Sequence, residues 1–441
     1  MALKIQKNYA KLFKNLEKLF ENRHFYQEFL TSDNSFVRER KLPFKTVVLL
    51  ILQLLKSSLS TELKRYHKTL FHSDLVVNWV SSSAFSQART KIKYDFFIEL
   101  NKFFLRFFYK STGFQTWYHF RLLAVDGSEL NLPPSQELKD KYGIHHTNSI
   151  RTEIPNARVS FLFDVKKHIT LDAQIESFRI SEQAMFEEHL LSIGKGDLLT
   201  ADANYGHFRI LKSIINRKAD YCIRISKSSA FVKDFIKSGE KDKVLIWYPS
   251  VRTQKNCKDN NVDSEPLKVR LLRIDLSDTI TEILITSLID DKKYNYDVMK
   301  DLYDQRWGAE EEIKKYMQRL LIEFFSSTKV NGVLQDFYAN IFVLNLVGFL
   351  AEPIYQKIDK DDKENGRKYK YQTNWTSAIS DIRERTILLF IREVAQVEAI
   401  IQSIQESFRK IIEPIRLGRK FPRDKRKKGS RQKAFMNYKP I

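Results

Sequence analysis

Apolar residues recur at spacings of three and four through residues 2–109, which is the spacing of one face of an α-helix. The Ser81–Ser83 cluster can cap a helix that would display four polar or basic side chains, namely Gln87, Arg89, Lys91 and Lys93. A capped basic helix can read DNA in a helix-turn-helix arrangement, although many such helices only solvate one face. The pattern predicts a helical region over residues 1–117.

The pattern then changes to a period of two, as in β-strands. The stretch FRLLAV is an apolar strand that ends at Asp126, and residues 157–177 read as a hairpin with a turn at Lys166–His168. A helix from about residue 181 to 193 leads to a short buried strand that ends at Asp202, and another helix and strand follow. This order predicts an α/β fold with a mixed sheet flanked by helices over residues 118–226.

Beyond residue 226 the helical signal fades and then returns. Strand patterns in VLIWY, LKVRLLRIDL and TEILITSL predict a mainly β insertion over residues 227–297. Helical spacing resumes over 298–358, which we assign to the same core as 118–226, and continues in a C-terminal helical region, 359–441, that ends in a basic tail. The longest apolar runs are shorter than the roughly 20 residues of a membrane-spanning helix, so we expect buried helices and no membrane.

Charge is unevenly distributed along the chain. The 75 Lys and Arg exceed the 54 Asp and Glu to give a net charge of +21, which favours a nucleic-acid partner. Residues 1–117 carry 20 basic against 9 acidic side chains, and residues 416–441 carry 11 against 1, so the centre is neutral. Basic ends suit phosphate contacts, but the tail could equally be a solvated appendage. Cys222 and Cys257, the only cysteines, are too few for a disulfide framework and indicate a reducing, cytoplasmic setting.

Three carboxylates are candidates for metal chemistry. Asp126 and Asp202 each stand where an apolar strand gives way to a turn, a position that suits a turn former as well as a functional side chain. In LYDQRWGAEEEIKKYM, Tyr303, Arg306 and Glu310 fall within about 60° of one another on one helix face, whereas Glu311 and Glu312 point elsewhere. Taken in isolation, this helix could simply bear a solvent-facing Arg306–Glu310 ion pair.

Carboxylates from separate elements suit divalent cations. Mg²⁺ prefers oxygen ligands, and two ions about 3.5 to 4 Å apart can stabilise the attacking and departing oxygens of a phosphoryl displacement. Without a cation, three converging carboxylates would repel one another. The sequence has no GxxxxGK[ST] or GxGxxG motif, which argues against ATP-driven or dinucleotide chemistry, and His145–His146 reads as a loop pair rather than a metal site.

The segments AVDGSELNLP, LLTADANYG and YDQRWGAEEE together resemble the three blocks of a DDE transposase, specifically the bacterial insertion-sequence-four family with its Y-(2)-R-(3)-E-(6)-K signature. The resemblance spans about residues 36–350. It implies an RNase H-like core with a β insertion between the second Asp and the Glu. It also implies that Asp126, Asp202 and Glu310 bind two Mg²⁺ or Mn²⁺ ions, and that Tyr303 and Arg306 contact phosphate near the transposon end.

The same resemblance implies a mode of action. Such an enzyme cleaves double-stranded DNA at terminal inverted repeats and transfers the released end into target DNA. We therefore expect a homodimer in the DNA complex and a bacterial, nucleoid-associated location. In relatives an aromatic residue of the insertion stacks on a flipped base, and Trp247 is eligible for this role, although a core Trp is the plainer interpretation.

One position departs from the family pattern. Met317 stands where the signature has Lys, and Lys314, which shares the predicted face of Glu310, could substitute. This departure leaves two alternatives open: a transposase-derived DNA-binding protein that has lost catalysis, and an RNase H-like nuclease.

Overall fold

The computed structural model describes residues 2–38, 40–71, 80–113, 116–144, 153–277, 280–305 and 307–415 of the chain. These residues form two compact units. The sheet unit contains the described parts of residues 114–129 and 157–314. The helical unit contains those of residues 1–113, 130–156 and 315–441. Residues 315–358, which the sequence pattern assigns to the core, therefore group with the N-terminal helices.

The sheet unit is built on one mixed sheet with the strand order β4-β3-β2-β5-β6-β9-β8-β7. Its first half consists of β2 (Phe120–Asn131), β3 (Asn156–Asp164), β4 (Ile169–Ser177), β5 (Asp197–Ala201) and β6 (Asp220–Arg224), and a short β1 (Thr116–Trp117) pairs with β2. β3 and β4 form the predicted antiparallel hairpin, whereas β2, β5 and β6 are parallel. This is the mixed α/β, RNase H-like arrangement that the sequence predicts.

The insertion extends the same sheet. β7 (Asp242–Trp247), β8 (Leu267–Ser277) and β9 (Ile280–Thr286) are antiparallel, and β9 pairs with β6. Two helices, α10 (Ala230–Lys237) and α11 (Val251–Asp259), also lie here, so the prediction of a mainly β insertion was incomplete. The sequence of α11, VRTQKNCKD, is polar and buries only Cys257, which is why it carries little helical periodicity.

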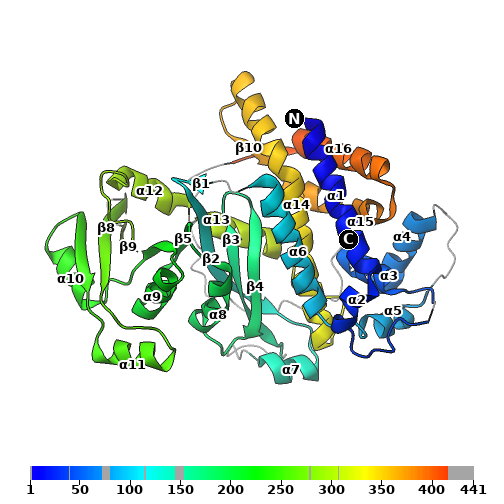
Figure 1. The fold of residues 1–441 in the computed structure, drawn as a ribbon, viewed down its shortest axis with the longest axis horizontal. Coiled ribbons are helices and arrows are strands. Elements are labelled where there is room, and N and C mark those ends of the chain that lie inside the picture. The colour runs from blue at the N-terminus through cyan, green and yellow to red at the C-terminus, as the bar shows by residue number, and fades with distance from the viewer. Residues whose placement is uncertain are drawn as a thin grey trace. The chain divides into compact units, whose positions relative to one another are not determined.

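Helices cover both faces of the sheet. α8 (Glu182–His189) and α9 (Phe208–Asn216) lie on one face, while α12 (Tyr296–Gln305) and α13 (Trp307–Lys314) lie on the other (Figure 1). On the second face, Met299 and Leu302 of α12 pack in a buried cluster with Leu122 of β2 and Leu198 of β5. Side chains two residues apart on a strand share a face, so every second residue of β2 and β5 faces α12 and α13.

The helical unit surrounds one long helix, α14 (Val330–Glu364), which contacts α3, α6, α15 and α16. The helical unit also contains a small sheet of β10 (Tyr371–Thr373) and β11 (Ile412–Pro414). The predicted C-terminal helical region contains two long helices, which are separate because Arg392 and Glu393 between them are extended. The other helices are α1 (Ala2–Glu21), α2 (Arg23–Tyr26), α3 (Phe44–Leu52), α4 (Leu59–Phe71), α5 (Ser82–Arg89), α6 (Asp95–Thr112), α7 (Gln136–Tyr142), α15 (Trp375–Ile391) and α16 (Val394–Lys410).

α14 is apolar along most of its length. Among the described residues it is the one helix long and apolar enough to cross a membrane, and 83% of its most apolar stretch is buried inside the protein. Burial of this kind is typical of a core helix, because the neighbouring helices already cover its apolar surface.

Candidate active site

Asp126 and Asp202 come from neighbouring parallel strands. The last paired residues of β2 and β5 are Ala124 and Thr200, so extending this register by two residues places Asp126 level with Asp202. Both aspartates then share the sheet face that α12 and α13 cover, since Leu122 and Leu198 belong to that face. Neighbouring strands are about 4.8 Å apart, so the structure brings these two predicted residues side by side.

The backbone around each aspartate fixes its carboxylate. Asp126 Oδ1 accepts a hydrogen bond from the Gly127 amide at 2.8 Å. Asp202 caps a short 3₁₀ turn, Ala203–Tyr205, by accepting from the Asn204 amide at 2.8 Å. Both side chains are half-buried.

Tyr303 lies close to the same end of the sheet but is buried. It is 1% exposed, and its hydroxyl donates a hydrogen bond to Glu282 of β9. Glu282 also accepts from Arg224 at 2.8 Å, and the β5–β6 register makes Arg224 level with Asp202. The sequence predicts that Tyr303 contacts phosphate. The structure corrects this prediction, because the Tyr303 hydroxyl is already bonded to the carboxylate of Glu282 inside the protein.

Glu310 and its neighbours lie on α13. Glu310 is half-buried, and Glu311 is exposed and paired with Lys314 at 2.5 Å. Glu312, expected to point away from the sheet, is instead buried, with its Oε1 2.6 Å from His168 Nδ1 in the β3–β4 turn. The helical spacing therefore predicted too few buried carboxylates on α13. It missed Glu312 because the β3–β4 turn places His168 against that side of the helix.

The sequence analysis did not single out two further groups beside the aspartates. Glu182, the first residue of α8, accepts a hydrogen bond from Asn204 Nδ2 at 3.3 Å. Tyr205 is fully buried. Burial raises the pKa of the Tyr205 hydroxyl, and the negative charges of Glu182, Asp126 and Asp202 raise that pKa further. The only sequence signal for Glu182 is its place after the N-cap residue Ser181.

A buried network fixes α8 to the hairpin. His189 Nδ1 lies 2.6 Å from Asp172 Oδ2, and His189 Nε2 lies 2.9 Å from Ser160 Oγ. Burial alone would raise the pKa of Asp172, but its hydrogen bond and charge interaction with His189 outweigh burial and lower that pKa. The order Asp, His, Ser is that of a nucleophilic triad, yet Ser160 and His189 are both 0% exposed, so the network is structural.

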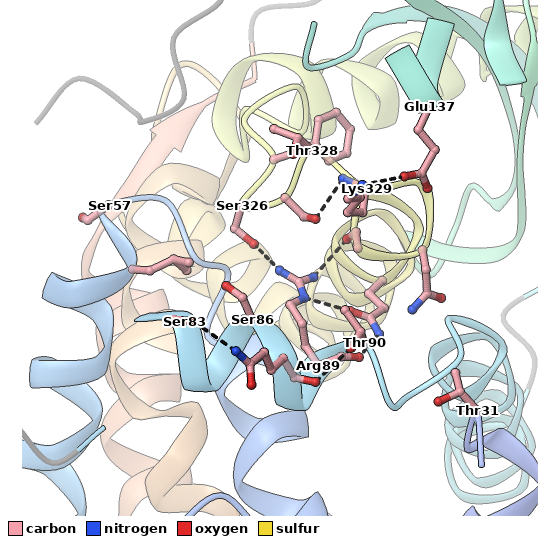
Figure 2. Close-up of a pocket in the computed structure, with 17 residues that line it drawn as sticks. Thr31, Ser57, Ser83, Ser86, Arg89, Thr90, Glu137, Ser326, Thr328 and Lys329 are labelled. Carbon is pink, nitrogen blue, oxygen red and sulfur yellow. Dashed lines mark hydrogen bonds and ion pairs between the residues drawn. The ribbon is translucent and has the colours of Figure 1, made fainter. Parts of the chain in front are cut away.

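Arg89, predicted to bind DNA, is buried in the helical unit at 3% exposure. As Figure 2 shows, its guanidinium lies at a pocket of about 710 Å³ and bonds to protein groups. These are Asp336 Oδ1 at 2.8 Å, Ser326 Oγ at 2.7 Å, Gln335 Oε1 at 2.9 Å and the Gly332 carbonyl at 2.9 Å. The Ser81 cap of α5 is confirmed, but α5 ends at Arg89 and turns this side chain inward.

The remaining predicted DNA contacts are scattered. Lys91 follows α5, is half-buried and lies 5.8 Å from the Phe36 ring centroid. Trp247 ends β7 and is also half-buried, with its ring against Phe208 and Phe231 at centroid distances of 5.3 and 4.6 Å. Arg306, His145–His146 and the basic tail from residue 416 onward lie outside the described residues.

Among the described residues, no three Asp, Glu, His or Cys side chains are close enough together to hold a metal ion unaided. The paired aspartates nevertheless provide the oxygen donors that Mg²⁺ prefers, and Mg²⁺ commonly takes one or two protein carboxylates and completes its shell with water and substrate phosphate. The donor chemistry therefore fits a divalent cation bound together with a phosphate.

Comparisons with known proteins identify the family of this chain. A family model described as Transposase DDE domain matches residues 117–346, just over half of the chain, and this range contains Asp126, Asp202 and Glu310. Transposase InsG for insertion sequence element IS4, from Escherichia coli strain K12, is 23% identical over 324 residues, which cover 71% of each protein.

Two other similarities are weaker. The putative transposase InsZ of the same organism is 24% identical over 177 residues, which cover 39% of this chain and 57% of that protein. A solved piggyBac transposase synaptic complex with hairpin DNA matches with a TM-score of 0.42 and 11% identity, covering 91% of this chain and 82% of that one. The family match over half of the chain decides the assignment: this chain belongs to the transposases with a DDE domain and is a DNA transposase.

Proposed function

We propose that the chain is a cut-and-paste transposase in which Asp126, Asp202 and Glu310 hold two Mg²⁺ or Mn²⁺ ions. The observation that carries this proposal is the level placement of Asp126 and Asp202 on the sheet face covered by α12 and α13. Glu310, which is half-buried on α13, is the third carboxylate of this proposal. When bound, such ions polarise the scissile phosphate and lower the pKa of the attacking hydroxyl.

The protein's own groups would position the DNA. Arg224 is level with Asp202, and its side chain is 35% exposed even though it pairs with Glu282. We assign its guanidinium a contact with a phosphate oxygen of the DNA. Tyr303 would act indirectly by holding Glu282, while Arg306, Lys314, Lys91 and Trp247 remain candidates for direct DNA contact.

The proposed substrates are double-stranded terminal inverted repeats and target DNA. Water would attack first at the transposon end, and the released 3′-hydroxyl would then attack the partner strand or the target. Pairing of two ends calls for a homodimer in the DNA complex. We place this activity in the bacterial cytoplasm, at the nucleoid, where the DNA of an insertion sequence is found.

Substitution of Asp126 tests the assignment. Asp126→Ala removes a ligand, so we expect cleavage of a labelled terminal-repeat duplex in Mg²⁺ to fall by more than the roughly 10–100-fold that removal of a group supporting a metal ligand costs. Binding measured by gel mobility shift should be retained. The control is Asp234→Ala, which removes an exposed carboxylate of α10 and should cleave as wild type.

Three results would count against the proposal. Normal cleavage by Asp126→Ala would refute the site. Binding without metal-dependent nicking by the wild-type protein would favour a DNA-binding protein that has lost catalysis. Cleavage without regard to the terminal-repeat sequence would favour an RNase H-like nuclease.

A further inference from the structure

The turn that follows β5 carries Asp202 and is closed by its own hydrogen bonds. Asp202 Oδ1 accepts from the Asn204 amide at 2.8 Å, and the Asp202 carbonyl accepts from the Tyr205 amide at 3.2 Å. These two bonds fix Asp202 to the turn, but they do not fix the turn to the rest of the sheet unit. The position of the Asp202 carboxylate therefore depends on what the turn contacts on either side.

Gly206 places one side of the turn against β6. A Cβ at position 206 would lie 2.7 Å from the Arg224 carbonyl oxygen, so the backbone of β6 would have to shift to accept it. A strand inside a sheet cannot shift without disturbing the hydrogen bonds to its neighbours, and β6 pairs with both β5 and β9. The turn is thus held closely on this side.

Tyr205 anchors the other side of the turn. Its side chain is fully buried, and its ring lies against Phe186 of α8 with a centroid distance of 5.6 Å. Burial raises the pKa of the Tyr205 hydroxyl, and the hydrogen bond between this hydroxyl and Ser160 of β3 offsets part of that rise. Tyr205 therefore joins the turn of Asp202 to both α8 and β3.

The hydrogen-bonded chain continues beyond Ser160. Ser160 Oγ lies 2.9 Å from His189 Nε2, and His189 Nδ1 lies 2.6 Å from Asp172 Oδ2. The lowered pKa of Asp172 keeps it ionised at neutral pH, so its carboxylate accepts the Nδ1 proton of His189. A neutral imidazole with its proton on Nδ1 accepts at Nε2 from the Ser160 hydroxyl, whose oxygen then accepts from Tyr205.

Every group in this chain has a partner of the correct kind. Tyr205, Ser160 and His189 are all fully buried, so water does not compete for their hydrogen bonds. Hydrogen bonds in such a low-dielectric environment are stronger than in water, and a fully satisfied buried network makes the surrounding structure rigid. The chain therefore extends from β4, through α8 and β3, to the turn that carries Asp202.

We propose that Tyr205 is a positioning residue for the transposase reaction and that it holds the Asp202 carboxylate in place through Ser160, His189 and Asp172. This inference rests on the proposed function, in which Asp202 is one of the active-site carboxylates. In this role Tyr205 contacts neither the DNA nor a metal ion. Its importance comes from geometry, because misplacing a reacting group by about 1 Å can lower the rate about 100-fold.

Removal of the Tyr205 hydroxyl tests this role. Tyr205→Phe keeps the ring, so we expect the affinity for a terminal-repeat duplex, measured by gel mobility shift, to equal that of wild type. Cleavage of the same labelled duplex should fall about 10–100-fold, the usual effect of losing a group that orients a metal-binding side chain. The matched control is Tyr221→Phe, which removes a buried hydroxyl that makes no hydrogen bond with any described residue and should cleave as wild type.

Hydrogen exchange provides a readout that needs neither metal nor DNA. In the full-length Tyr205→Phe variant, mass spectrometry should show the amides of residues 203–206 exchanging about two- to tenfold faster, as expected from the loss of one neutral hydrogen bond. Ser160→Ala breaks the chain at its centre and should have the same effect on the turn. A rise of equal size throughout the sheet unit would show that Tyr205 only stabilises the fold, and would overturn the proposal.

Asp202→Ala separates this role from the proposed function. If Asp202→Ala loses cleavage but Tyr205→Phe matches wild type in both cleavage and exchange, the positioning role is refuted and the proposed function stands. Slower cleavage by Tyr205→Phe without faster exchange of the turn would also refute it, because the hydroxyl would then act by another route. If Asp202→Ala itself cleaves as wild type, the proposed function fails and the positioning role fails with it.

Discussion

Gly308 determines how closely α13 approaches the hairpin. A Cβ at this position would lie 2.6 Å from Val165 Cγ1, well inside normal contact distance. Valine is branched at Cβ and has few alternative rotamers, so it cannot easily move aside. The close approach of α13 to the hairpin therefore depends on the absence of a side chain at position 308. The placement of Glu310 and Glu312 depends on the same close approach.

We expect Gly308→Ala to destabilise the protein. Overpacking costs about 1–3 kcal/mol in the free energy of unfolding, which exceeds the roughly 1 kcal/mol gained by alanine in a helix. Urea unfolding measures this difference. Gly194→Ala is the matched control, because a Cβ there has no atom within 4 Å.

A double variant identifies the cause. Val165→Ala removes the methyl group that a Cβ at position 308 would meet, so it should restore part of the stability lost in Gly308→Ala. Equal stability of Gly308→Ala and wild type would show that α13 can shift away from the sheet at no cost.

At the scale of elements, the network of Asp172, His189 and Ser160 joins α8 to β3 and β4. The lowered pKa of Asp172 means that its ionised form is stabilised in the folded state. This stabilisation is present above the ordinary pKa of 3.8 and is lost as the pH falls through the lower pKa of the folded state.

Asp172→Asn should therefore destabilise the protein in a pH-dependent way. We expect a loss of about 1.5–3 kcal/mol at pH 7, which is the contribution of a hydrogen bond to a charged group. The difference from wild type should shrink as the pH falls below 3.8 and through the lower pKa of the folded state, below which Asp172 is protonated in both states. Urea unfolding at both pH values measures it, with exposed Asp234→Asn as control; a constant difference would contradict the assignment.

At the scale of the whole molecule, basic charge is concentrated at the two ends of the sequence. Residues 416–441 contain 11 Lys or Arg and one Asp. Deleting these residues should make the dependence of DNA affinity on salt concentration shallower, by about 0.9 in logarithmic slope for each DNA phosphate that the tail neutralises.

Titrations of duplex DNA at several salt concentrations measure that slope. The control is a chain of the same length in which neutral residues replace the basic ones of the tail, and it should behave like the deletion. An unchanged slope in both variants would identify the tail as a solvated appendage.

The sequence by itself determined the local features of this protein. Apolar runs located the strands β2 and β5, although β2 continues through Asp126 to Asn131 and does not end there. The signature around Tyr303 identified the family, because both signals depend on neighbouring residues. The N-cap at Ser81 was predictable for the same reason.

Only the tertiary structure decided which side chains meet. Strand register placed Arg224 level with Asp202, and close approach at Gly127 brought in Glu182. Packing buried Arg89 against Asp336, 247 residues away, so that a basic side chain expected on the surface became a core ion pair. Such contacts depend on pairing between distant segments, and local periodicity holds no information about that pairing.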